Sequence, residues 1–509
     1  APAARAAELL ALDRVLPMQK IYDGNFYELT LPEAGPGTVY AYRVHPRQGD
    51  PVDHCDPYGF GMELRPDHRS VVRDLDEYTF GDDAWRRRPL RPGAGPLNIY
   101  EIHLGSWRRR EDGGFYTYEE LAEPLADYLT ESGYNAVEFL PLAEHPCDES
   151  WGYQTTGFFA PTSRYGTAAG LMALVDTLHR RGIAVLLDFV PAHFAVDAYG
   201  LARFDGTCLY EYPSQDVGVS EWGSCNFMHS RGEVRSFLQS AAHYWLDRYH
   251  FDGLRFDAIS RILYWQGDGR RGVNGNGVEL LRTMNQGLQA RHPGCILAAE
   301  DSTNFEGVTR PAEQGGLGFT YKWDLGWMHD TLSFLQTDPA ARPDAYHKLT
   351  FSMLYYYKER YLLPLSHDEV VHGKATVLQK MNGGYEGKFP QGRALYLYMM
   401  VHPGAKLNFM GSEFGQLREW DEGREQDWML RRYPLHDGFY HFMRDLNRLY
   451  LQSPALWAKD DDPDGFAWLD CHREAQCLYL LERRGGGQRL GAAFNFSDRP
   501  QRFALPADP

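Results

Sequence analysis

Residues 251–260, with the sequence FDGLRFDAIS, form an apolar stretch that is interrupted by a cation and a carboxylate, Arg255 and Asp257. The stretch predicts a buried strand. Because side chains on a strand alternate between two faces, Arg255 and Asp257 project to one side, and Leu254 and Phe256 project to the other. An isolated pair of this kind is more often a structural ion pair than a functional site. The interpretation therefore depends on whether similar residues end other strands of the chain.

Three further strand-like runs end in polar residues of the same kind. They are residues 186–193 (LLDFVPAH), 297–301 (LAAED) and 362–369 (LLPLSHDE). Each begins with apolar residues that suit a buried strand and finishes with an acid, a histidine or both. The recurrence favours a shared site over four unrelated ion pairs.

The composition indicates a globular protein of two or three domains, because 509 residues exceed what one core usually supports. A net charge of −17 argues against nucleic acid and anionic membranes as partners. The basic runs 86–88 and 108–110 are too short to change this and are interpreted as solvated loop faces.

The cysteines and the hydropathy pattern bear on location. The seven cysteines are scattered and form no C-x-x-C pair, which is typical of reduced thiols in the cytoplasm. No apolar run approaches the ~20 residues of a membrane span, and residues 1–20 lack the apolar core of a signal peptide. We therefore expect a cytoplasmic protein with no membrane partner.

Residues 1–96 are predicted to be a separate β-sandwich module that ends in a linker. Short alternating runs such as 26–31 and 39–44 are separated by Pro and Gly turns, the pattern of an antiparallel sheet. Residues 86–96 are rich in Arg, Pro and Gly and are interpreted as the linker.

Residues 97–450 alternate strands with longer amphipathic helices, which predicts an α/β fold. Thr117 to Glu120 fit a capping box before a helix that stops at Gly133. An insertion is expected at about 194–230. Besides the strand of Arg255 and Asp257, strands are predicted at 98–103, 136–140, 183–190, 295–300, 318–322, 361–366 and 405–410.

Eight strands in this order suit a closed (β/α)8 TIM barrel. An open doubly wound sheet is the alternative, but residues 104–107 (LGSW) lack its glycine-rich signature. Helices are expected from about 414 to 451. Residues 451–509 are predicted to form a C-terminal antiparallel β domain with strands at 467–469, 477–481 and 490–496.

Active sites of such barrels lie where the carboxyl ends of the strands meet. We therefore expect one cluster at these ends, made of Asp188, His193, Arg255, Asp257, Glu300, His367 and Asp368. A metal site, a structural charge network and a glycosidase centre are all compatible with these residue types. The zinc motifs H-E-x-x-H and paired C-x-x-C are absent, and two-metal sites usually lack a facing arginine, so a metal is disfavoured.

A retaining glycosidase needs a carboxylate nucleophile and a second carboxyl group that protonates the leaving oxygen. Asp257 is the candidate nucleophile, because Arg255 beside it favours its ionised form. Glu300 is the candidate general acid and base. Asp368 is expected to stabilise charge near the reacting carbon, and His193 and His367 to donate hydrogen bonds to sugar hydroxyls.

Four of these motifs resemble the strand-end motifs of the α-amylase superfamily in order and spacing. They are residues 188–193 (DFVPAH), 253–258 (GLRFDA), 299–301 (AED) and 366–368 (SHD). Four longer stretches are similar to 1,4-α-glucan (glycogen) branching enzymes, namely 151–157 (WGYQTTG), 316–327 (GLGFTYKWDLGW), 367–374 (HDEVVHGK) and 410–416 (MGSEFGQ). The similarity runs from about residue 22 to residue 503.

The resemblance implies a retaining transglycosylase that cleaves α-1,4 glucan and transfers the chain to a 6-hydroxyl. It implies Asp257 as nucleophile, Glu300 as acid and base and Asp368 as stabiliser. The sugar at the cut is then bound by Tyr153, Asp188, His193, Arg255 and His367. Glycogen and amylose are the implied partners, with no cofactor and no metal, and we expect a monomer. A hydrolase of α-glucans and a catalytically silent glucan-binding protein are the rival interpretations.

Overall fold

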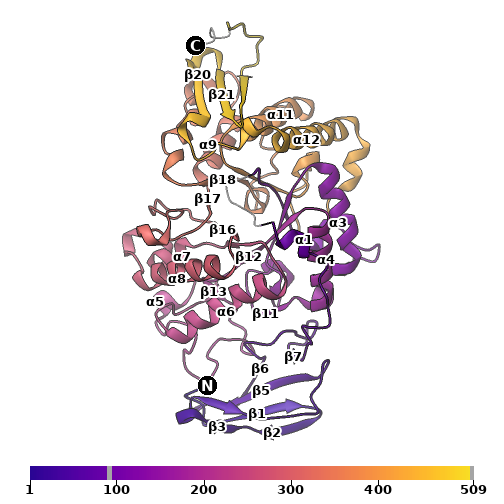
Figure 1. The fold of residues 1–509 in the computed structure, drawn as a ribbon, viewed down its shortest axis with the longest axis vertical. Coiled ribbons are helices and arrows are strands. Elements are labelled where there is room, and N and C mark those ends of the chain that lie inside the picture. Colours follow the sequence, from indigo (N-terminus) through magenta and orange to yellow (C-terminus); the bar gives the residue numbers. More distant parts are fainter. Residues whose placement is uncertain (89–94, 505–509) are drawn as a thin grey trace.

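The computed structural model of the chain describes residues 1–88 and 95–504. Residues 89–94 of the predicted linker and 505–509 of the predicted C-terminal domain lie outside the described residues. Eight parallel strands close into a barrel at the centre of the molecule (Figure 1), which confirms the predicted fold class. Around the ring they are β12 (Ala184–Phe189), β15 (Gly253–Phe256), β16 (Ile296–Ala299), β17 (Tyr321–Trp323), β18 (Tyr361–Leu365), β19 (Ala405–Phe409), β8 (Asn98–Ile102) and β9 (Ala136–Phe139).

Strand β17, the sixth barrel strand in chain order, begins later than expected. The sequence predicts a strand at 318–322, whereas β17 spans Tyr321–Trp323. Gly318 has a φ of +78°, in the left-handed region, which cannot continue a strand. The predicted strand was therefore wrong for residues 318–320.

Helix α3 (Tyr118–Ser132) shows how the sequence sets an element's ends. The Thr117 hydroxyl accepts a bond from the Glu120 backbone N–H, and the Glu120 carboxylate accepts one from the Thr117 N–H, as the capping box predicts. Gly133 ends the helix with a φ of +79°. The buried face of α3 packs against α4 (Ala168–Arg180) outside the barrel.

The other long helices also follow the alternation. They are α6 (Gly232–Arg248), α8 (Gly275–Arg291), α9 (Leu325–Gln336), α11 (Tyr385–Val401) and α12 (Pro434–Gln452). Within the described residues, no helix combines the length and the apolar character needed to cross a membrane.

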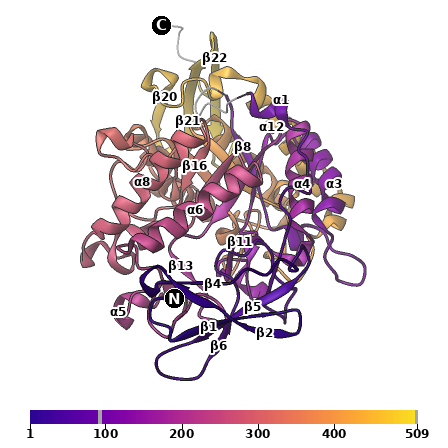
Figure 2. The same cartoon turned by 60° about the horizontal axis from the view of Figure 1, so that its bottom comes forward.

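Antiparallel sheets lie at the two ends of the molecule (Figures 1 and 2). The N-terminal sheet consists of β1 (Ala6–Ala11), β2 (Arg14–Pro17), β5 (Val39–His45), β6 (Val52–His54) and β7 (Ser70–Val71), next to a hairpin of β3 (Gln19–Ile21) and β4 (Phe26–Glu28). The C-terminal sheet consists of β20 (Phe466–Arg473), β21 (Leu478–Gly485) and β22 (Gln488–Asn495), whose strands are longer than predicted. The domain boundaries at 96 and 450 stay predictions.

Two small hairpins stand above the carboxyl ends of the first barrel strands. One pairs β10 (Ala143–Glu144) with β11 (Gly157–Pro161), and Tyr153 lies on the loop between them. The other pairs β13 (His193–Phe194) with β14 (Cys225–Asn226) across the predicted insertion, which also contains the short helix α5 (Gln215–Gly218). Both hairpins therefore bring loop residues to the end of the barrel where the predicted site lies.

Candidate active site

Arg255 is the centre of the site. In the barrel register, Asp188 on β12 is the partner of Arg255 on β15, so their side chains start side by side. Arg255 Nη1 donates to both carboxyl oxygens of Asp188, at 2.6 Å each. Each of the two side chains is 1% exposed. Removing one partner of such a buried pair costs about 3 to 5 kcal/mol, because the other charge is left uncompensated.

The same guanidinium also holds the two carboxyl groups that the sequence predicts to react. Nη1 of Arg255 donates to Asp257 Oδ1 at 2.9 Å, and Nη2 donates to Glu300 Oε2 at 2.8 Å. The Ala258 backbone N–H donates to the same Glu300 oxygen at 2.9 Å. Ala258 has a φ of +43°, an uncommon value for a residue with a side chain, and such strain persists where the surroundings enforce it. Asp257 and Glu300 thus lie next to each other at one mouth.

His367 closes the site on the opposite side of the barrel mouth. Its ring Nδ1 and its backbone N–H both donate to the Glu101 carboxylate, at 2.6 and 2.9 Å. The other ring nitrogen, Nε2, lies 3.5 Å from Asp368 Oδ1 and 3.2 Å from the Tyr153 hydroxyl. The Tyr153 hydroxyl also donates to Asp188. Tyr153, Asp188, His367 and Asp368 therefore join the cluster around Arg255.

The charges of the cluster shift its pKa values in opposite directions. Burial disfavours a charged His367, but the Glu101 and Asp368 carboxylates raise its pKa to about 9. Asp368 is desolvated in part, yet the positive charges of His367 and Arg255 hold its pKa below the usual range. Its side chain is 48% exposed, whereas that of Asp257 is 12% exposed. Asp368 is therefore ionised and reachable from solvent.

The pKa of Asp257 differs from the simple expectation. Burial and the neighbouring carboxylates of Glu300, Asp188 and Asp368 raise it well above the usual value, although Arg255 acts in the opposite direction. Burial likewise raises the pKa of Asp188 to about 6 against the effect of Arg255. Along the chain only Arg255 adjoins Asp257, whereas Glu300, Asp188 and Asp368 are distant in sequence. Several carboxyl groups in this site thus compete for one cation.

His193 is the one predicted site residue that stands apart. No hydrogen bond or ion pair joins it to the cluster in the described part of the chain, and its Nδ1 has no partner there. Its ring packs against Trp222 of the insertion, with centroids 5.2 Å apart. Burial lowers its pKa to about 4, so the ring is neutral. His193 is therefore placed as a neutral donor or acceptor beside an aromatic ring.

Two functional candidates, Glu101 on β8 and Glu138 on β9, were not predicted from the sequence. They are partners in the barrel register and are both buried. Glu101 binds His367, whereas neither oxygen of Glu138 has a partner among the described residues. Burial beside Glu101 and Asp188 raises the pKa of Glu138 well above its usual value, so it is a neutral acid. Each interrupts an apolar strand as Arg255 does, and that signal was available in the sequence.

A cavity of about 950 Å³, here called the side cavity, opens next to the cluster. Its walls come from residues 301–310, 322–329 and 351–361, which follow or connect β16, β17 and β18. The Trp323 ring in its wall faces the Arg255 guanidinium at 4.5 Å. Across the residues described, no group of three or more His, Cys, Asp or Glu is arranged to hold a metal ion.

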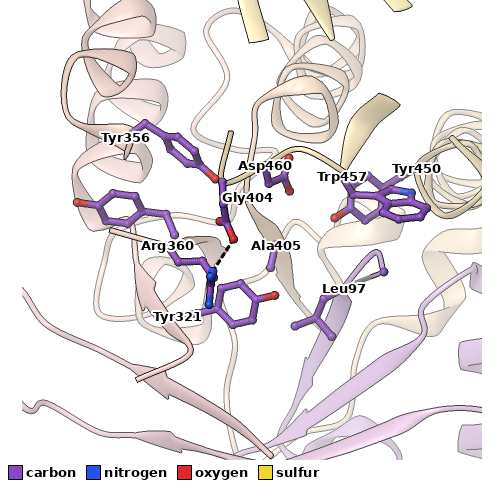
Figure 3. Close-up of a pocket in the computed structure, with 12 residues that line it drawn as sticks. Leu97, Tyr321, Tyr356, Arg360, Gly404, Ala405, Tyr450, Trp457 and Asp460 are labelled. Atoms are coloured by element: carbon purple, nitrogen blue, oxygen red, sulfur yellow. Dashed lines mark hydrogen bonds and ion pairs between the residues drawn. The ribbon is translucent and has the colours of Figure 1, made fainter. Parts of the chain in front are cut away.

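A much smaller cavity of about 20 Å³ lies at the other end of the barrel (Figure 3). It is lined by residues at the amino ends of strands, among them Tyr321, Tyr361 and Ala405. Arg360 reaches Asp461 there at 2.7 Å, which ties the barrel to the segment before the C-terminal sheet. Active sites of such barrels lie at the opposite end, where the strands have their carboxyl ends, so this cavity is interpreted as structural.

Comparison with known proteins decides the family. A model of the α-amylase catalytic domain matches residues 121–205. A 1,4-α-glucan branching enzyme from Nitrosomonas europaea is 46% identical over 499 residues, which cover 95% of this chain and 68% of that protein. The chain belongs to the 1,4-α-glucan branching enzyme family. A branching enzyme from Geobacillus stearothermophilus is 44% identical and is matched over 74% of its length and 92% of this chain.

Solved structures agree on the fold of this branching enzyme. A pullulanase from Paenibacillus barengoltzii complexed with maltotetraose superposes with a TM-score of 0.77, covering 100% of this chain and 87% of that one. Its sequence identity of 17% supports the shared fold alone. The family expected from the sequence motifs is thus confirmed, and the hydrolase alternative is not favoured.

Proposed function

We propose that this branching enzyme works by a retaining mechanism in which Asp257 is the nucleophile and Glu300 the acid and base. The observation that carries the proposal is that one guanidinium, that of Arg255, binds both carboxyl groups at 2.9 and 2.8 Å. A retaining mechanism needs two carboxyl groups close together, because one forms the covalent intermediate while the other serves the departing oxygen.

In the first half of the reaction, an ionised Asp257 oxygen attacks the anomeric carbon of an α-1,4-linked glucosyl unit. Glu300 gives its proton to the glycosidic oxygen, and the bond between that oxygen and the anomeric carbon breaks. The leaving chain departs with a new 4-hydroxyl, and the donor chain stays bound to Asp257 as an ester. In the second half, Glu300 removes the proton of an acceptor 6-hydroxyl. That oxygen attacks the anomeric carbon and frees Asp257, which completes the α-1,6 branch.

The remaining residues stabilise positive charge and bind hydroxyls in this proposal. Asp368 is ionised and 48% exposed, which suits a carboxylate that approaches the oxocarbenium-like transition state from solvent. The His367 imidazolium donates to a sugar hydroxyl through Nε2, because Glu101 occupies Nδ1. Tyr153 offers its ring to the apolar face of the sugar. Asp188 and His193 contact further hydroxyls.

The proposal extends to the partners and the setting. Glycogen and amylose are the substrates, and the enzyme acts as a monomer in the cytoplasm, without binding nucleic acid. A net charge of −17 and seven free cysteines support the last two points. Residues 1–96 are proposed to be a glycogen-binding-type module, 97–450 the catalytic barrel and 451–509 a C-terminal β domain.

The test follows amylose through both iodine colour and reducing ends. Transfer lowers the colour without a matching rise in reducing ends, whereas hydrolysis changes both. Asp257→Asn is expected to abolish the colour change, and Asp247→Asn, an exposed substitution on α6, is the matched control. Unchanged activity in the Asp257 variant would overturn the assignment. Equal changes in colour and reducing ends with the unmodified enzyme would overturn transfer itself.

A further inference from the structure

The guanidinium of Arg255 lies over an aromatic ring that the proposed mechanism does not use. Its Cζ is 4.5 Å from the centre of the Trp323 ring, close enough for the electron-rich face of an indole to attract the cation. The carboxyl partners of the guanidinium are bound through its N–H groups, since Nη1 donates to Asp188 and Asp257 and Nη2 donates to Glu300. The contact with the ring is therefore additional to the three ion pairs.

The barrel register explains how the ring reaches the cation across one intervening strand. Arg255 on β15 pairs with Ala298 on β16, and Ala298 pairs with Tyr321 on β17. Trp323 follows Tyr321 by two residues, so both side chains project from the same face of β17, where they join an apolar cluster that draws on most of the barrel strands. Because Ala298 has only a methyl group, it leaves space for the indole to lie against the guanidinium.

Trp323 also separates Arg255 from the side cavity. The ring contributes to the wall of this cavity, whereas Arg255 does not line it. Trp323 is 1% exposed, and so is the Arg255 side chain. A charge that is kept from water interacts more strongly with its partners, because the dielectric around it is low. The indole is thus a barrier between the water of the side cavity and the ion pairs of Arg255.

The other contacts of Trp323 do not explain why an indole occupies this position. Its Nε1–H has no hydrogen-bond partner in the described ranges, and an unpaired buried donor costs stability. A leucine would fill the core without that cost, so what the indole supplies is its face, which attracts a cation more strongly than that of phenylalanine. The Tyr153 ring lies farther from the Arg255 Cζ, at 5.8 Å, and its hydroxyl donates to Asp188.

We propose that Trp323 is a positioning residue, whose ring holds the Arg255 guanidinium in the orientation that binds the reacting carboxyl groups and keeps cavity water away from it. The inference rests on the proposed roles of Asp257 and Glu300. Without the ring, the guanidinium tilts and is hydrated from the side cavity, so its attraction for both carboxyl groups weakens. A smaller fraction of Asp257 is then ionised and aligned for attack. Substrate binding is unchanged, because the ring is almost inaccessible.

The test compares Trp323→Leu and Trp323→Phe with Trp327→Leu. Trp327 is a matched control, because it is also 1% exposed with an Nε1 that has no partner among the described residues, but it lies on α9 and packs against His402. Branching of amylose is measured at a temperature where thermal melts show all proteins folded. Trp323→Met replaces Trp323→Leu if the latter does not fold, since methionine fills irregular space without an aromatic face.

The kinetic constants show whether the ring acts through Arg255 or on the substrate. Trp323→Leu is expected to lower kcat roughly 10- to 30-fold with KM unchanged, the effect of losing one desolvated contact between a cation and a ring. Trp323→Phe keeps a ring and is expected to retain most of kcat, and Trp327→Leu to retain all of it. A rise in KM at constant kcat would mean that the ring contacts glucan and would overturn the inference. Equal losses in the Leu and Phe variants would overturn it too.

The pH profile separates positioning from loss of packing. A weaker attraction from Arg255 raises the pKa of Asp257 further, so the acidic decline of kcat/KM is expected to move to higher pH in Trp323→Leu and to stay in place in Trp327→Leu. If the unmodified protein forms no α-1,6 linkages, the proposed function fails. If it forms them and Trp323→Leu matches Trp327→Leu in kcat and in pH profile, only the inference is overturned.

Discussion

Replacing Glu101 by Gln isolates the charge that keeps His367 protonated. Glu101 makes two bonds to His367 and is the largest influence that raises its pKa from 6.5 to about 9. That difference corresponds to about 3 kcal/mol of preference for the imidazolium. Without the Glu101 charge, burial dominates and the pKa falls. At neutral pH the variant then loses a cation beside Asp368, and kcat/KM is expected to drop by up to roughly 100-fold.

The pH dependence distinguishes this effect from simple damage. The imidazolium is present below the pKa of His367, so the unmodified enzyme is expected to lose activity as pH rises through about 9. In Glu101→Gln this alkaline loss moves to lower pH, so the two activities differ most near pH 8 and less at the acidic and alkaline ends of the range. The assay is branching of amylose from pH 5 to 10, with Glu123→Gln as the control, since Glu123 is 61% exposed on α3.

Stability gives a second measure of the same interaction. Because the folded-state pKa of His367 is raised, its contribution to stability is complete below about pH 6.5 and is lost as pH rises through about 9. The difference in unfolding free energy between the unmodified protein and Glu101→Gln is therefore expected to shrink above pH 9. If Glu101→Gln loses activity at the same alkaline pH as the unmodified enzyme, the proposed effect of Glu101 on His367 is refuted.

Three further predictions concern other residues. The raised pKa of Asp257 means that the proposed nucleophile is lost as pH falls through a value above the usual range, so kcat/KM on amylose is expected to decline well before pH 4; full activity at pH 4 would contradict this. Glu138→Gln is expected to raise Tm at pH 8 but not at pH 4. Keeping the buried Glu138 protonated costs stability only at pH values above the usual pKa of a glutamate, and Gln removes that cost. Thermal melts at both pH values check this prediction. Thr117→Ala is expected to lower the unfolding free energy by about 1 kcal/mol in urea denaturation, through loss of the α3 cap; an unchanged midpoint would count against it.

The barrel could be predicted because its signals are local. Apolar runs, turn glycines and the capping box at Thr117 each lie within one element, so all eight strands and their order were expected. The start of β17 was misplaced because an apolar and aromatic run does not reveal that Gly318 is left-handed. The ends of an element depend on backbone angles that composition alone does not specify.

The site was predictable where strand ends carry polar residues and not where contacts cross the barrel. Arg255, Asp257, Glu300 and Asp368 follow recognisable runs. Glu101 binds His367 across 266 positions of the chain, a pairing that no local pattern contains. The raised pKa of Asp257 also depends on carboxyl groups far away in sequence. Electrostatic balance is thus a property of the closed barrel rather than of any one strand.

A single guanidinium binds three carboxylates, so the proposed reaction centre behaves as one unit. Replacing any one of these acids changes how Arg255 binds the other two. The effects of combined substitutions are therefore not expected to be additive. A substitution at one of these acids therefore has to be compensated at the others if the buried Arg255 charge is to stay fully paired.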